Sequence, residues 1–123
     1  MTVLITILIF VVIIFLYYKI VNYQNVKKIS EEAERRLQQM LGDLQNGNSL
    51  NNEENQGTIP KAGYDNYEIQ IINTKHYGDL DAVYEITNKV VLHYKENLTQ
   101  TYKVKQRYNW GVGMWSTEWE RID

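Results

Sequence analysis

The sequence VLITILIFVVIIFLYY, from Val3 to Tyr18, decides how the rest of the chain is interpreted. These sixteen residues include no charge, no Gly and no Pro, and Thr6 is the only polar interruption. A helix rises about 1.5 Å per residue, so Met1 to Ile20 would span about 30 Å, the thickness of the hydrocarbon core of a bilayer. The stretch therefore predicts a transmembrane anchor over residues 1–21.

The flanks of this stretch favour an uncleaved transmembrane helix over a buried core helix or a cleaved signal peptide. Lys19 can extend its ammonium group to the lipid headgroups, and Tyr17, Tyr18 and Tyr23 suit the interface. A core helix this apolar on every side needs a larger protein around it. A signal peptide has a basic start and a small-residue cleavage site, whereas no Lys or Arg precedes this run.

The basic residues beside the anchor predict the side of the membrane on which the body lies. Only Met1 and Thr2 precede the run, whereas the juxtamembrane basic residues follow it: Lys19, Lys27, Lys28, Arg35 and Arg36. Because Lys and Arg are retained on the cytoplasmic side, this count predicts a cytoplasmic body, with an extracytoplasmic body as the alternative. The chain has no Cys, so disulfides give no clue about the compartment.

A second, amphipathic helix is predicted from Ile29 to Leu44, within a juxtamembrane segment of residues 22–45. Its apolar residues recur at spacings of three and four, as in one helical stripe: Val26, Ile29, Ala33, Leu37, Met40, Leu41 and Leu44. Ser30 is the expected N-cap, and Asn46-Gly47 the expected stop. The stripe is expected to pack on the following sheet or on the membrane surface, with a coiled coil as a further alternative.

Residues 46–63 are interpreted as an Asn-rich linker. Five Asn residues and few apolar ones occur here, too few to offset the cost of ordering the chain. From Tyr64 onward the apolar residues alternate, beginning with Tyr67 to Ile71, which predicts an antiparallel β domain over residues 64–123. Leu80 to Lys95 is interpreted either as two strands joined at Asn88-Lys89 or as one long bent strand.

The last hairpin is the clearest pattern in this domain. Tyr102, Val104, Tyr108 and Trp110 share one face, Lys103, Lys105 and Arg107 share the other, and Gly111 to Gly113 forms the turn. On the return strand, Trp115, Thr117 and Trp119 alternate with Ser116, Glu118 and Glu120. Matching the aromatic faces also sets the basic row opposite the acidic row, so two patterns predict one register.

Together these patterns predict a membrane-anchored α+β protein. An N-terminal transmembrane helix and an amphipathic helix precede a small antiparallel sheet of four or five strands, and the amphipathic helix covers the apolar face of that sheet.

The sequence offers no motif for catalysis, for a cofactor or for a metal. His76 and His93 lack the spacing of metal ligands, and Gly111 to Gly113 is not followed by a helix that would bind phosphate. The basic row of the hairpin lies opposite the aromatic face, and Glu118 and Glu120 neutralise it, so nucleic acid is not expected as a partner. We therefore expect a protein that is not an enzyme.

The three Trp residues are the candidate partner-binding aromatics: Trp110, Trp115 and Trp119. Exposed aromatic side chains anchor interfaces, although the same residues also suit the core of a small domain. The expected function is that of a non-catalytic single-pass membrane protein that presents an interaction or scaffolding domain at the membrane surface. Its expected partners are the lipid bilayer and either another protein or a second copy of the chain.

The order of elements also resembles type IV pilin-like subunits. An apolar N-terminal helix continues into an amphipathic one and is followed by a loop and an antiparallel sheet, and the resemblance implies a subunit of a filament or a secretion system. The family has Glu at the fifth position of its mature apolar segment, where this chain has Ile5, and a basic leader, where this chain has Met1. A small ligand-binding or enzyme-accessory subunit is the third expectation.

Overall fold

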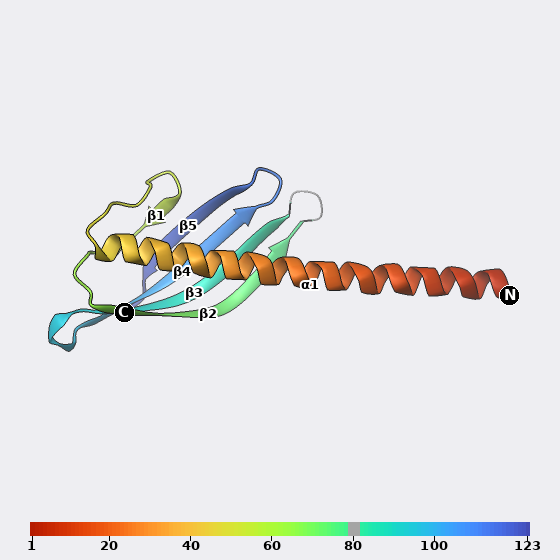
Figure 1. The fold of residues 1–123 in the computed structure, drawn as a ribbon, viewed down its shortest axis with the longest axis horizontal. Helices are drawn as coiled ribbons and strands as arrows, with labels where there is room; N and C mark the ends of the chain where they lie inside the picture. Colours follow the sequence, from red (N-terminus) through yellow and green to blue (C-terminus); the bar gives the residue numbers. More distant parts are fainter. Residues whose placement is uncertain (79–81) are drawn as a thin grey trace.

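The protein combines one long helix with a five-stranded sheet (Figure 1). The computed structural model describes residues 1–78 and 82–123, apart from the side chain at position 22. Its elements are α1 (Thr2–Gln45), β1 (Asn55–Gly57), β2 (Asn66–Tyr77), β3 (Val83–His93), the short 3-10 turn η1 (Lys95–Asn97), β4 (Thr99–Asn109) and β5 (Met114–Arg121). The second half of α1 lies across the sheet, and the first half projects beyond it. The predicted α+β class is confirmed.

α1 is one continuous helix, so the prediction of two helices was wrong. No Gly or Pro occurs between Thr2 and Leu41, and nothing in that range forces the backbone out of helical geometry. Ser30, the expected N-cap, lies in the helix interior. The predicted stop is confirmed, because Gly47 follows the helix with a φ of 85° and donates its N–H to the carbonyl of Leu44 at 3.0 Å.

The sheet is mixed rather than antiparallel, with the order β1-β5-β4-β3-β2. β1 pairs in parallel with β5 and places Asn55 opposite Thr117 and Gly57 opposite Trp119. Gly57 adopts a φ of 91°, and a Cβ there would lie 2.1 Å from the Trp119 carbonyl oxygen, so the strand requires glycine. The linker prediction for residues 46–63 missed this strand because backbone pairing, not apolar burial, orders it.

β3 runs without interruption from Val83 to His93, so the alternative of one long strand is correct and the predicted turn at Asn88-Lys89 is wrong. Leu80, where that strand was expected to begin, lies outside the described residues. β2 continues past Ile71 to Tyr77 through an irregularity between Ile71 and Asn73. His76 consequently lies in the strand, with its ring stacked 4.6 Å from that of Tyr84.

The β4–β5 hairpin has the predicted register. Four cross-strand pairs set the apolar face and the charged face: Tyr108 opposite Trp115, Val104 opposite Trp119, Lys105 opposite Glu118, and Lys103 opposite Glu120. The strands end at Asn109 and resume at Met114, so the Gly111 to Gly113 turn is confirmed.

The apolar stripe of α1 is buried against the sheet, which is one of the two positions that the sequence left open. Leu37, Leu41 and Leu44 pack in one cluster with residues that include Val104 and Trp119. Nearer the apolar first half of α1, Ile29 and Ala33 pack with Tyr84, Ile86 and Trp115. Burying one Leu side chain contributes about 1.5–3 kcal/mol, so this seam supplies much of the stability of the fold.

Candidate functional site

The first half of α1 is an exposed apolar rod. From Val3 to Ile20 its large apolar side chains are more than half exposed. Within the described residues, α1 is the one helix long and apolar enough to cross a membrane, and none of its most apolar window is buried. A contiguous apolar surface of this size is typical of a segment that contacts a membrane or another protein.

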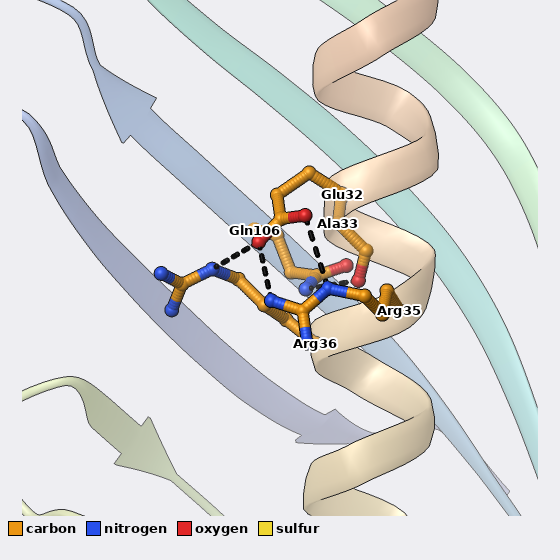
Figure 2. A network of polar contacts seen from close by, with 5 residues as sticks. All are labelled: Glu32, Ala33, Arg35, Arg36 and Gln106. Carbon is orange, nitrogen blue, oxygen red and sulfur yellow. Dashed lines mark hydrogen bonds and ion pairs between the residues drawn. The ribbon is translucent and has the colours of Figure 1, made fainter.

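The juxtamembrane basic residues divide into two groups. Lys19, Lys27 and Lys28 are exposed, and the Lys19 ammonium lies 4.6 Å from the ring centre of Phe15. Arg35 and Arg36 are instead occupied within the domain, as Figure 2 shows, because both contact the carboxylate of Glu32. The two arginines follow Glu32 by three and four residues, so they lie on the same side of α1.

Glu32 sets the geometry of these two arginines. Arg35 binds it at 2.6 Å, and this hydrogen bond is the main cause that lowers the pKa of the Glu32 carboxyl. The Nε of Arg36 lies 3.4 Å from the same carboxylate without hydrogen-bond alignment, and its guanidinium lies 5.0 Å from the ring centre of Trp115. Arg36 therefore covers the core and is not a free lipid-binding cation.

The three Trp side chains do not form one surface. Trp119 is 1% exposed and Trp115 is 9% exposed, so both belong to the core. The Trp119 indole donates its N–H to Asn55 Oδ1 at 3.0 Å. Trp110 is 56% exposed and lies in the turn after β4. The prediction of partner-binding aromatics was therefore wrong for Trp115 and Trp119, which are core residues. Of the three, Trp110 alone is exposed.

A buried polar clamp joins α1 to the sheet and was missed from the sequence (Figure 2). Gln106 of β4 donates from Nε2 to the Ala33 carbonyl of α1 at 2.8 Å, and its Oε1 accepts a hydrogen bond from Asn88 Nδ2 at 2.9 Å. Both amides are fully buried. The available signal was the position of Gln106 between Val104 and Tyr108, which places a polar side chain on the apolar face.

A Gln106→Ala variant is expected to lose about 1–3 kcal/mol of the free energy of unfolding, because it removes two buried hydrogen bonds, to the Ala33 carbonyl and from the Asn88 amide. The measurement is the urea midpoint of the full chain in detergent, followed by pulse proteolysis. Gln70→Ala is the matched control, since Gln70 is exposed on β2 and its loss should change the midpoint little. Equal midpoints for the two variants would contradict the clamp.

A shallow cleft of about 220 Å³ lies between the second half of α1, the segment before β1, and β5. Its lining mixes amides, carboxylates and apolar groups, among them Arg36, Asp43, Asn51, Glu54 and Trp115. Within residues 1–78 and 82–123, no group of three or more His, Asp or Glu side chains is placed to hold a metal ion. The cleft has no arrangement of nucleophile, base and oxyanion donors that points to a reaction.

Comparison with known proteins gave no match: no protein-family description, no curated protein and no solved structure is similar to this chain. The function must therefore be inferred from the arrangement of α1 and the sheet.

Proposed function

We propose that the chain is a non-catalytic single-pass membrane protein that holds a small interaction domain at the bilayer surface. The observation that carries this proposal is the division of α1 into two halves. The first half is apolar and unburied, and the second half is fixed to the sheet, with no break between them. One element thus serves as both anchor and scaffold.

Continuity of α1 matters because it would transmit the orientation of the anchor to the domain. A helix of 44 residues is about 66 Å long, and about half of that length fills the thickness of a bilayer. The remaining half is held to the sheet by apolar packing, by the Gln106 clamp, and by Tyr64, whose hydroxyl donates to the Leu41 carbonyl. A domain tethered in this way meets membrane partners at high effective concentration.

The best surface for a protein partner on this domain is the outer edge of β2. This strand lies at the end of the sheet order, and none of its twelve residues is buried; Tyr67 and Ile69 are half-buried and the other ten are exposed. Its open edge offers backbone N–H and C=O groups, to which a partner strand or a second copy can add. Ile71 and Ile72 are exposed there and supply apolar contact.

The side of the membrane is tested with a single Cys at Asn52, an exposed position before β1. We expect a membrane-impermeant maleimide to label Asn52→Cys only after permeabilisation of expressing cells, because the exposed Lys19, Lys27 and Lys28 favour a cytoplasmic body. The native chain has no Cys and is the unlabelled control. Extraction of the unlabelled chain from membranes by alkaline carbonate would contradict the anchor itself.

The continuity of α1 favours a pilin-like subunit as the second candidate. In this alternative the apolar halves of several copies pack together in a filament, and the sheets lie outside. Labelling of Asn52→Cys in intact cells, together with filaments in sheared surface material, would support it. Labelling only after permeabilisation would exclude it.

A further inference from the structure

A second exposed apolar group lies at the β4–β5 turn. It consists of Trp110, Val112 and Met114, which we call the hairpin tip, and Val112 and Met114 are 66% and 62% exposed. The sequence from Asn109 to Met114 includes no charged residue. Figure 1 shows this turn on the side of the sheet toward the N-terminal half of α1, whereas η1 and the C-terminus lie at the other end.

The packing of β5 on α1 gives the direction of the tip independently. Trp119 packs in the cluster of Leu37 and Leu41, whereas Trp115 packs in that of Ile29 and Ala33. Following β5 from Trp119 back to Trp115 therefore moves toward the start of the helix. The tip continues β5 in the same direction, so it extends toward the apolar half of α1.

The neighbouring start of β3 also approaches this half. The Trp110 backbone N–H donates to the Ala82 carbonyl at 2.9 Å, which ties the tip to the start of β3. Two residues after Ala82, Tyr84 belongs to the core cluster against which Val26 also packs. Burial is the main cause that raises the pKa of the Tyr84 hydroxyl, and the hydroxyl of Tyr18 is a second cause. This end of the sheet thus lies close to the end of the apolar run.

The distances fit contact with lipid headgroups. Between Ile20 and Ile29 the helix rises about 13 Å. The chain from Trp115 to Val112 covers at most about 10 Å of that rise at about 3.3 Å per residue. The headgroup layer is about 5–7 Å thick on each side, and a helix tilt of about 20° toward the sheet brings the tip nearer. At this greatest extent the tip would lie level with the headgroups and short of the hydrocarbon core.

We propose that the hairpin tip is a second membrane contact, in which Trp110 and Val112 insert at the headgroup level of the bilayer that α1 spans. Trp is enriched at this depth because its ring is apolar and its indole N–H binds polar groups. The exposed Lys27 and Lys28 directly precede Ile29, which packs with Ala82 and Trp115 at this end of the sheet, and they favour anionic headgroups. This inference rests on the proposed membrane anchor and adds a fixed orientation of the domain.

The test uses the full chain, free of native Cys, with one environment-sensitive fluorophore per molecule. Single Cys residues replace Val112 in the tip, Leu98 at the opposite end of the sheet, and Ile14 in the apolar half. Leu98 is 62% exposed and therefore matches Val112 in the free domain. Each protein is reconstituted in vesicles of phosphatidylcholine and phosphatidylglycerol that contain lipids with a nitroxide on the headgroup.

We expect quenching at Val112→Cys to be several times that at Leu98→Cys, with emission shifted to the blue. Adding Trp110→Ser to Val112→Cys should reduce the quenching, and folding should persist because Trp110 is exposed. Equal quenching at Val112 and Leu98, with Ile14 shielded in lipid, would overturn the tip contact alone. A label at Val112 that is shielded but not quenched would indicate a second copy and would also overturn it. An Ile14 label accessible to water would instead refute the anchor.

Discussion

A Trp119→Ala variant is expected to lose about 3–5 kcal/mol of the free energy of unfolding, the largest effect of any single truncation in this domain. Trp119 is 1% exposed and packs against the helix cluster of Leu37, Leu41 and Leu44. Its removal creates a cavity and also leaves the buried Asn55 amide without the indole N–H. A small domain has about 5–15 kcal/mol in total, so this loss is a large share of its stability.

The measurement is the urea midpoint of the full chain in detergent, read by pulse proteolysis of the sheet. Trp110→Ala is the matched control because the same side chain is removed from an exposed turn, where the change should stay within about 0.5 kcal/mol. If Trp119→Ala and Trp110→Ala lost the same free energy of unfolding, the assignment of Trp119 to the core and of Trp110 to the surface would be wrong.

The contrast between these residues shows the limit of the sequence pattern. Trp110, Trp115 and Trp119 all continue the apolar alternation of the hairpin, and the alternation correctly predicts the register. It does not show that β4 ends at Asn109, one residue before Trp110. Trp110 lies in the turn beyond that point and belongs to neither core cluster, so an identical side chain changes from core to surface. The strand end depends on tertiary pairing, which periodicity alone does not include.

Polar residues caused the other errors for a common physical reason. Asn55 was placed in a linker and Asn88 in a turn, and Gln106 was not recognised as a buried residue. Each misassignment arises because polar side chains normally avoid the interior. In the structure each one hydrogen-bonds a specific partner, which offsets the cost of burial. Such pairing requires residues distant in sequence to meet, so it is invisible until the fold is known. The apolar stripe of α1 needed no such partner and was predicted correctly.

The continuity of α1 also bears on the proposed function. Two separate helices would let the domain turn relative to the apolar half, whereas one continuous helix fixes the domain to that half. With the proposed anchor, such a domain would keep one end toward the bilayer, and the hairpin tip carries exposed apolar residues at that end. Continuity of the helix and membrane contact of the tip therefore support each other.

This dependence gives the second large effect, which is expected for Gln24→Pro. Proline removes a backbone donor and clashes with the carbonyl four residues earlier, so it should kink or break α1 next to the membrane. Helix from residue 24 onward can persist because proline is tolerated at a first helical position. The seam of Ile29 to Leu44 should therefore stay packed, while the domain loses its fixed orientation.

Spin labels on Cys residues at Ile14 and Val112 measure this orientation directly. We expect one narrow distance distribution in the native background and in the control Gln24→Ala, and a broad or displaced one in Gln24→Pro. The quenching of a Val112 label by headgroup nitroxides should fall in parallel. If Gln24→Pro left the distance distribution unchanged, the helix would not be the element that orients the domain, and contact of the tip with lipid would have to hold the domain by itself.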